Sequence, residues 1–250
     1  YEKVSMSLAH RPVLLRRFVE GKFGFQQEGK AVTPQWSDDV HLADGLFAIP
    51  RRELILLWDW GLNPTCIITQ LTPLGTWNIL QSFVGEDIGV DELIRYQVLP
   101  HIRARHAKAP LRHYGDPQGI QREQSNSQNS AVRVMKELLP GPWRPGPQKW
   151  LPRIEPLRAA LTRMNNGHGL IQVDRENAKE VWHALRGGWH YHVARTGVVS
   201  GDPVKDINSH PGDAMSYGAA IIFPLKGVDN RLANLKQPQR PGYGFASTPQ

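Results

Sequence analysis

The chain has 250 residues, of which 40% are hydrophobic, and it carries 30 Lys and Arg against 23 Asp and Glu. This length can bury a large core, as one large domain or as one domain with appendages. No apolar run reaches the roughly 20 residues that a membrane helix needs, and no signal-peptide core is visible near the start. We therefore expect a protein that is neither in the membrane nor secreted.

The charge balance favours a polyanionic partner. The formal net charge is +7 and the sequence pI is about 9.7, and a basic surface of this size favours nucleic acid first. The single cysteine, Cys66, excludes an internal disulfide and a Cys-based zinc finger, and it fits a reducing cytoplasm. Because the chain begins with Tyr1 rather than Met, we interpret it as a piece of a longer protein.

The first part of the chain predicts little regular structure. Residues 1–28 are expected to be an approach segment, with a helix over Arg11–Glu20, where apolar residues recur at helical spacing. A short strand is expected over Phe47–Ile49.

Three strands follow and form an antiparallel meander. Glu53–Trp60 is apolar on both faces, which is typical of a central strand that is covered on both sides. Thr65–Leu71 is rich in β-branched residues and Thr76–Val84 alternates, with turn residues between the runs. On one face of the third strand we expect Trp77, Ile79, Gln81 and Phe83.

Helices and strands then alternate to the end of the chain. Helices are predicted over Asp91–Arg105 (kinked or ended by Pro100), Ala131–Leu139, Pro152–Arg163, Arg175–Arg186 and Pro211–Ile222, and strands over Leu111–Gly115, Leu170–Val173 and Trp189–Val193. Residues 140–147 are expected to form a loop and residues 193–207 a protruding hairpin. This order predicts an α/β fold, a mixed sheet flanked by helices, and the ribonuclease-H-like fold shares it.

Three aspartates are placed where a strand or helix could deliver them to one point. Asp59 ends the first predicted strand of the meander, Asp116 follows the strand Leu111–Gly115, and Asp213 lies at the start of the last helix. Gathered carboxylates repel one another unless a cation joins them. Three oxygen ligands suit a hard divalent metal such as Mg²⁺ and, with it, phosphate chemistry.

The sequence around these aspartates resembles the C-terminal nuclease domain of the tailed-phage terminase large subunit. The resemblance covers residues 11–222, and the order and spacing of its motifs are more specific than any one of them. The motifs are Trp58-Asp59-Trp60-Gly61 with Pro64-Thr65, Gly115-Asp116-Pro117 with Gly119, Ser209-His210 followed by Asp213-Ala214, Pro152-Arg153-Ile154, Gly187–Tyr191, and Arg16–Phe23.

The resemblance implies a function and a set of roles. It implies a ribonuclease-H-like endonuclease that cuts concatemeric viral double-stranded DNA with little sequence preference. Asp59 would bridge two Mg²⁺ or Mn²⁺ ions about 3.5–4 Å apart, with Asp116 and Asp213 completing one site each. It further implies the portal protein and the small terminase subunit as partners, and the host cytoplasm as location. We expect the isolated domain to be monomeric.

The same resemblance divides the chain into a linker from an absent ATPase domain (1–28), a nuclease domain (29–223) and a flexible tail (224–250). A phosphate-binding loop needs Gly-x4-Gly-Lys-Ser/Thr. The nearest match, Gly141–Gly146, is followed by Pro147-Gln148, and its prolines lack the N–H donors. We therefore expect no ATPase activity in this fragment.

Further side chains are candidates for support and for DNA contact. Asp206 and His210 are near enough to Asp213 in sequence to assist the carboxylates. An equally good interpretation is that they cap the start of the last helix. Pro211-Gly212 is a poor helix start, and if Ser209 or His210 caps the helix, Asp213 falls in its first turn. The candidate contacts to DNA phosphates are Lys149, Arg153, Arg158, Arg195 and Lys205.

Two other interpretations remain open on the sequence. Another ribonuclease-H-like metalloenzyme, such as a junction resolvase or transposase core, would use the same carboxylates on branched or end-specific DNA. A basic binding module without catalysis would keep the acidic residues for structure alone.

Overall fold

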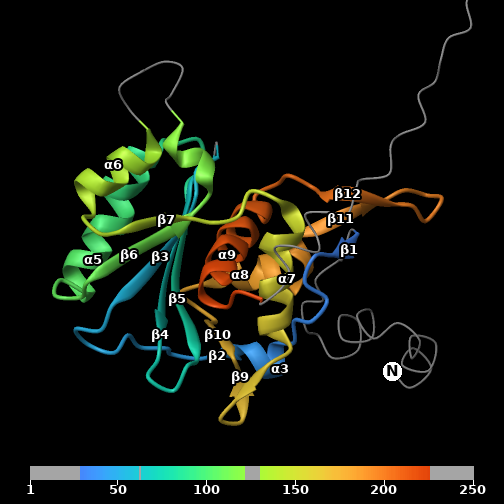
Figure 1. Cartoon of the computed structure of the whole chain (residues 1–250), viewed down its shortest axis with the longest axis horizontal. Coiled ribbons are helices and arrows are strands. Elements are labelled where there is room, and N and C mark those ends of the chain that lie inside the picture. Colours follow the sequence, from blue (N-terminus) through green and yellow to red (C-terminus); the bar gives the residue numbers. More distant parts are fainter. Residues whose placement is uncertain (1–28, 62, 122–129, 226–250) are drawn as a thin grey trace, which may run out of the picture.

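The structure is a computed structural model that describes residues 29–61, 63–121 and 130–225. The helix expected over Arg11–Glu20, the linker and most of the tail lie outside these residues. A single large sheet is covered by helices on both faces, and a small second sheet extends to one side (Figure 1). Within the described residues, none of the helices has the length and apolar character of a membrane span.

The large sheet has seven strands in the order β2-β10-β5-β4-β3-β6-β7. Its strands are β2 (Leu42–Ala43), β3 (Leu54–Asp59), β4 (Thr65–Leu71), β5 (Trp77–Val84), β6 (Leu111–Gly115), β7 (Trp143–Pro145) and β10 (Ile171–Asp174). The predicted meander β3-β4-β5 is confirmed as antiparallel, while β6, β7, β10 and β2 each run parallel to a neighbour. The expected mixed α/β sheet is therefore confirmed.

Strand β3 separates two hydrophobic cores. Every residue of the strand is buried, and alternate side chains point to opposite faces. Ile55 and Leu57 belong to the core under α7–α9, whereas Leu54, Leu56 and Trp58 belong to the core under α4–α6. The prediction from the continuous apolar run, a strand covered on both sides, is thus confirmed.

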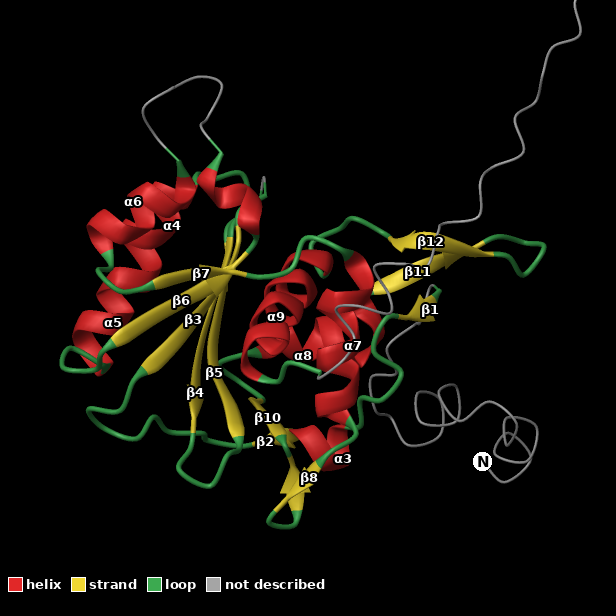
Figure 2. Cartoon of the chain, viewed as in Figure 1, coloured by secondary structure: helices red, strands yellow, loops and turns green. Residues whose placement is uncertain are grey.

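The helices form one layer on each face of the sheet (Figure 2). One layer holds α4 (Val90–Leu93), the π-helical turn η1 (Ile94–Val98), α5 (Leu99–Arg105) and α6 (Ala131–Leu138); the other holds α7 (Trp150–Leu161), α8 (Lys179–His183), η3 (Ala184–Gly188) and α9 (Ser209–Ile222). The short elements are α3 (Asp38–His41), the 3₁₀ turn η2 (Pro117–Ile120), β8 (Met164–Asn165) and β9 (His168–Gly169).

The predicted hairpin is present but belongs to a separate sheet. Strand β11 (His190–Val193) pairs with β12 (Val199–Pro203) on one side and β1 (Lys30–Ala31) on the other. Its turn contains Gly197 at φ 83°, a left-handed conformation that glycine adopts without strain. In Figure 1 this arm projects away from the large sheet.

Two predictions near the sheet edges were wrong. Phe47–Ile49 forms no strand, because the side chain of Gln70 satisfies the backbone of Ile49: its amide nitrogen donates to Gln70 Oε1 (2.6 Å), and Gln70 Nε2 donates back to its carbonyl (3.2 Å). The expected loop at 140–147 contains strand β7, which pairs with β6 at the edge of the sheet, where its proline is tolerated.

Two further elements differ in detail from the prediction. The helix does not end at Pro100 but continues through it after the π-helical turn Ile94–Val98. In β5, Gln81 pairs with Ile68 and Ile79 with Thr69, so the residue between them is a bulge. Phe83 consequently packs against one hydrophobic core, whereas Trp77 and Ile79 belong to the other.

Buried His113 makes the fold sensitive to acid. Its Nδ1 accepts a hydrogen bond from Trp58 Nε1 (3.1 Å), and burial lowers the pKa of His113 to about 4. Between that value and the unfolded pKa of about 6.5, the unfolded chain binds more protons, so stability falls as pH falls through this window. We expect His113→Gln, which keeps an acceptor for Trp58, to remove up to about 2 kcal/mol of this acid-induced loss between neutral pH and about pH 5. Urea unfolding at neutral pH and near pH 5 measures it, and an unchanged pH dependence would contradict it.

Candidate active site

Asp59 and Asp116 are neighbours because two parallel strands end together. Asp59 is the last residue of β3, and Asp116 directly follows β6. The register pairs Trp58 with Gly115, and the amide nitrogen of Asp116 donates to the Trp58 carbonyl (3.1 Å). The carboxyl ends of adjacent parallel strands meet at one edge of a sheet, which is where ligand sites of α/β proteins form.

Helix α9 brings Asp213 to the same edge. The helix packs across β3, β4 and β6, and a Cβ on Gly212 would lie 2.3 Å from the Trp189 ring. Glycine at position 212 therefore allows the helix to approach the indole, which explains why a residue with low helix propensity stands there. The N-cap is Asn208, so Asp213 lies in the second turn of the helix. A cap at Ser209 or His210 would have placed it in the first turn.

The three aspartates line one cavity of about 760 Å³. Asp59 and Asp213 are buried, and Asp116 is half-buried. Burial raises the pKa of Asp59; the negative charges of Asp213 and Asp116 raise that pKa further, while the hydrogen bond from His210 opposes the rise. The three carboxylates therefore act on one another electrostatically.

Two cations of different exposure hold Asp213. Its Oδ1 accepts from Arg153 Nη2 (2.8 Å) and its Oδ2 from Lys205 Nζ (2.5 Å). The Arg153 side chain is 11% exposed and the Lys205 side chain 69%. Arg153 also donates through Nη1 to Tyr217 Oη (2.5 Å) and lies over the Trp150 ring. Arg153 is thus fixed inside the protein, whereas Lys205 reaches in from solvent.

The other two aspartates are held by neutral donors or by a histidine. Asp59 Oδ2 is 2.7 Å from His210 Nδ1. Asp116 Oδ1 accepts from the backbone of Gln118 (2.9 Å), and the Asp116 carbonyl accepts from Trp60 Nε1 (3.0 Å). One oxygen of each carboxylate, Oδ1 of Asp59 and Oδ2 of Asp116, has no hydrogen bond from a described residue.

The donor set suits a hard divalent cation, although the side chains do not yet form a closed ligand cage. Among the described residues, no three His, Cys, Asp or Glu side chains are arranged to hold a metal ion. Both oxygens of Asp213 are paired with cations, Oδ1 with Arg153 and Oδ2 with Lys205. Carboxylate oxygens are the ligands that Mg²⁺ and Mn²⁺ prefer, and the exposed Lys205 can leave without breaking a packed contact. The residues therefore fit a metal once Lys205 moves aside.

The remaining candidates have different positions. His210 lines the cavity beside Asp59. Asp206 also lines it, but its Oδ1 accepts from the backbone of Asn208 and Ser209 (both 3.0 Å), so it acts as a cap at the entry to α9. Lys149 and Arg195 are exposed and lie outside this cavity.

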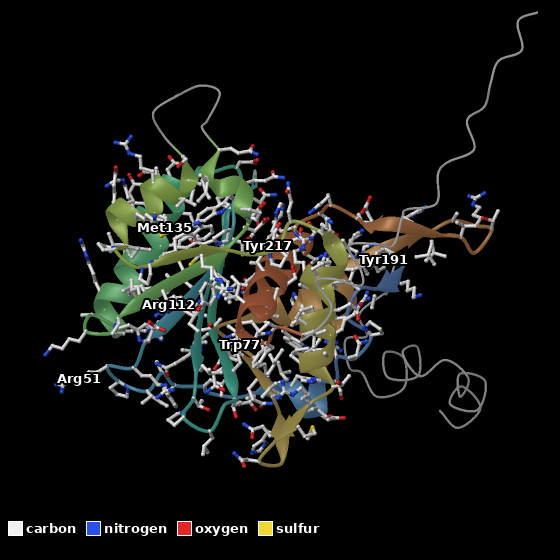
Figure 3. All side chains as sticks on the ribbon, in the orientation of Figure 1. Arg51, Trp77, Arg112, Met135, Tyr191 and Tyr217 are labelled. Atoms are coloured by element: carbon white, nitrogen blue, oxygen red, sulfur yellow. The ribbon has the colours of Figure 1, made fainter. Side chains whose placement is uncertain are left out.

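Arg158 has a structural position that differs from the expected DNA contact. Its Nε donates to the Val32 carbonyl (2.9 Å), Nη1 to Glu155 (2.8 Å) and Nη2 to Tyr191 Oη (3.3 Å). These contacts tie α7 to the small sheet, where Figure 3 labels Tyr191. Arg153 is likewise engaged by protein groups, so neither guanidinium is presented freely to a phosphate.

Sequence reasoning gave no role to Tyr217 or to Gln118 and Gln121, which also line the cavity. Tyr217 follows Asp213 by four residues on a helix, a spacing that puts both on one face. This spacing could have indicated that Tyr217 lies near the carboxylates. Burial raises the pKa of the Tyr217 hydroxyl, so it stays protonated near neutral pH. The two glutamines carry no such signal.

Comparison with known proteins identifies the fold. No protein-family model matches the chain, and no curated protein is significantly similar in sequence. The large terminase from a thermophilic bacteriophage superposes with a TM-score of 0.57 at 14% identity, covering 78% of this chain and 46% of that one. The chain has a phage large-terminase fold. A second crystal form of the same terminase gives a TM-score of 0.55 at 16% identity, covering 80% of this chain and 46% of that one.

The expectation of a terminase-like fold is thereby confirmed, and the chain spans about half the length of that large terminase. The nuclease domain of the large terminase from bacteriophage SPP1, solved with bound Mn, gives a TM-score of 0.46 at 12% identity, over 71% of this chain and 93% of that domain. At these identities the likeness concerns the architecture, and the chemistry of the site follows from the geometry of its own residues.

The two cations of Asp213 predict unequal effects on stability. Arg153→Met leaves a buried carboxylate with one exposed partner and should cost about 3–5 kcal/mol of unfolding free energy. Lys205→Met removes a mostly exposed cation while Arg153 still pairs with the buried carboxylate, and it should cost about 1 kcal/mol or less. Urea unfolding of both variants at neutral pH measures the difference, and equal costs would contradict the proposed division between a fixed and a replaceable cation.

Proposed function

We propose that this chain is a metal-dependent endonuclease that cleaves double-stranded DNA. The observation that carries the proposal is the convergence of Asp59, Asp116 and Asp213, from two strand ends and a helix, on one cavity. The likeness to a large terminase, at 14% identity, concerns the architecture alone. The proposed activity therefore depends on the chemistry of the site.

Each residue of the site has a proposed task. Asp59, Asp116 and Asp213 hold the divalent ions, Mg²⁺ or Mn²⁺. When bound, such ions would lower the pKa of a water for attack at phosphorus and neutralise charge on the leaving oxygen. His210 orients Asp59, Arg153 fixes Asp213, and the indole of Trp60 and the amide of Gln118 hold the Asp116 segment.

The DNA backbone is proposed to cross the cavity mouth beside the hairpin arm. Lys205 at the cavity and Arg195 at the hairpin turn are exposed cations on this side, and Lys149 adds a third near the start of α7. Contacts of this kind go to phosphates and carry little sequence information. They suit an enzyme that cuts many sequences.

The finer assignments rest on the terminase resemblance. We propose two ions bridged by Asp59, concatemeric viral DNA as substrate, and the portal protein and small terminase subunit as partners in the host cytoplasm. The divisions at 1–28 and 224–250, the monomeric state of the domain and the lack of ATP hydrolysis stay predictions.

The function is tested with the three aspartates. We expect Asp59→Asn, Asp116→Asn and Asp213→Asn each to reduce Mn²⁺-dependent cleavage of linear duplex DNA by at least about a hundredfold, because each removes an anionic ligand. The matched control is Asp202→Asn, an exposed aspartate of β12 that does not line the cavity. Initial cleavage rates on linear plasmid, with circular dichroism to verify folding, provide the measurement.

The outcome also separates the competing functions. Full activity of Asp59→Asn would refute the metal-site assignment. Faster cleavage of a four-way junction than of linear duplex would favour a resolvase-like enzyme. DNA binding without cleavage in any divalent metal would favour a basic binding module.

Lys205 is proposed to compete with metal for Asp213. A mostly exposed lysine contributes about 1 kcal/mol or less to its ion pair, so Lys205→Met should tighten Mn²⁺ binding by up to about fivefold. Isothermal titration with Mn²⁺ in the absence of DNA measures this directly. Arg195→Met is the control, because it removes an exposed cation of the same arm that lies outside the aspartate cavity. Weaker Mn²⁺ binding in Lys205→Met, or the same gain in both variants, would contradict competition at Asp213.

A further inference from the structure

A second cavity of about 590 Å³ lies at the other end of strand β3. It opens between the segment 46–51 and the end of α5, and its lining includes Leu54, the first residue of β3. Asp59 is the last residue of the same strand, so the two sites are separated by roughly 17 Å at about 3.3 Å per residue. Figure 3 shows Arg51, beside this cavity, and Tyr217, in the aspartate cavity, on different sides of the sheet. We refer to it as the basal pocket.

The basal pocket carries positive charge without an acidic counterpart. Arg51, Arg105 and Lys108 line it and are exposed, and none of its lining residues is Asp or Glu. None of the three has an ion-pair partner within the described part of the chain. Other surface arginines do have one: they are Arg95 with Asp91, Arg112 with Glu53, and Arg175 with Asp44.

The two histidines of the pocket are partly buried and lie within the electrostatic influence of Arg105. Burial, together with the smaller effects of His106 and Arg105, lowers the pKa of His101 to about 4. The pKa of His106 is lowered by burial and then by Arg105. Both rings face a site where another cation is unfavourable and an anion is favourable.

Apolar groups form the rest of the pocket. Leu54 and Leu80, both buried, lie at its base, while the Phe47 side chain at its edge is 85% exposed and Ile49 is 38% exposed. An exposed aromatic side chain beside an apolar base is typical of a docking site. The pocket therefore combines a place for an apolar side chain with a rim that attracts carboxylates.

We propose that the basal pocket binds an acidic segment of a partner protein, with one aliphatic or aromatic side chain flanked by Asp or Glu. Leu54, Leu80 and Phe47 would receive the apolar side chain, and the cationic rim would pair with its acidic neighbours. Charge complementarity argues against the chain's own ends. Residues 1–28 hold five Lys and Arg against three Glu, and residues 226–250 hold four against one Asp, so both are net positive.

Duplex DNA fits the pocket less well. Its phosphates would satisfy the rim, but nothing on a duplex backbone would cover the apolar base. A duplex across the aspartate cavity would also lie at the opposite end of the sheet. The inference therefore concerns a protein partner and does not depend on the proposed nuclease activity.

The full chain tests this with fluorescence anisotropy of a labelled peptide of Asp and Glu around a single Leu. The double variant Arg105→Glu with Lys108→Glu should weaken binding at least tenfold, and Phe47→Ser severalfold. Arg103→Glu is the matched control, since Arg103 is an exposed cation of the same helix α5 outside the pocket. All these positions are exposed, and circular dichroism verifies that each variant folds.

Several results would overturn the proposal. Equal losses in Arg103→Glu would show general charge attraction, and equal affinity for a peptide without Leu would remove the apolar role. Displacement of the peptide by a duplex oligonucleotide, with the same dependence on Arg105 and Lys108, would assign the pocket to nucleic acid. Absence of peptide binding would also refute it. Because the pocket variants keep all three aspartates, cleavage rates measured in parallel report separately on the proposed nuclease.

Discussion

The arrangement of the site depends on the ion pair between Asp213 and Arg153. Asp213 is only 2% exposed, and a carboxylate at that depth needs a partner that is buried with it. Arg153 fulfils this need from α7, so α7 and α9 must pack together. The close packing of α9 also requires a glycine at position 146, because a Cβ there would lie 2.6 Å from the Tyr217 ring. One buried charge pair thus fixes the distance between two helices and the position of the third aspartate.

Sequence reasoning succeeded where the signal is local. The apolar run of Glu53–Trp60 and the β-branched run of Thr65–Leu71 predicted β3 and β4, and Leu111–Gly115 was predicted as the strand before Asp116. An aspartate at the end of a strand lies at the edge of the sheet. Since β3 and β6 are parallel neighbours, Asp59 and Asp116 are brought together by register alone. The mixed sheet and the meeting of these two residues could therefore be predicted from the chain before its structure was considered.

It failed where the outcome depends on distant partners. Phe47–Ile49 has strand-like residues, but a glutamine side chain from β4 satisfies its backbone, and no periodicity reveals that. Arg153 and Arg158 look like surface cations in the sequence because the partners that bury Arg153 and tie Arg158 to the small sheet are far along the chain. Asp213 is 60 residues from Arg153, so nothing near either residue indicates the pair.

The two cations on Asp213 also explain how an acidic site can exist before any metal enters it. Three carboxylates facing one cavity would repel one another: the pKa of Asp59 is raised first by burial and then by the charges of Asp213 and Asp116. Arg153 offsets the charge permanently from the protein side, because it is packed between Trp150 and Tyr217. Lys205 offsets it from the solvent side with a side chain that is mostly exposed, and the free energy to move it is small. A fixed cation behind the carboxylate therefore keeps the three residues stable without a metal, and an exposed cation in front is the one that the proposed metal site requires to be replaced.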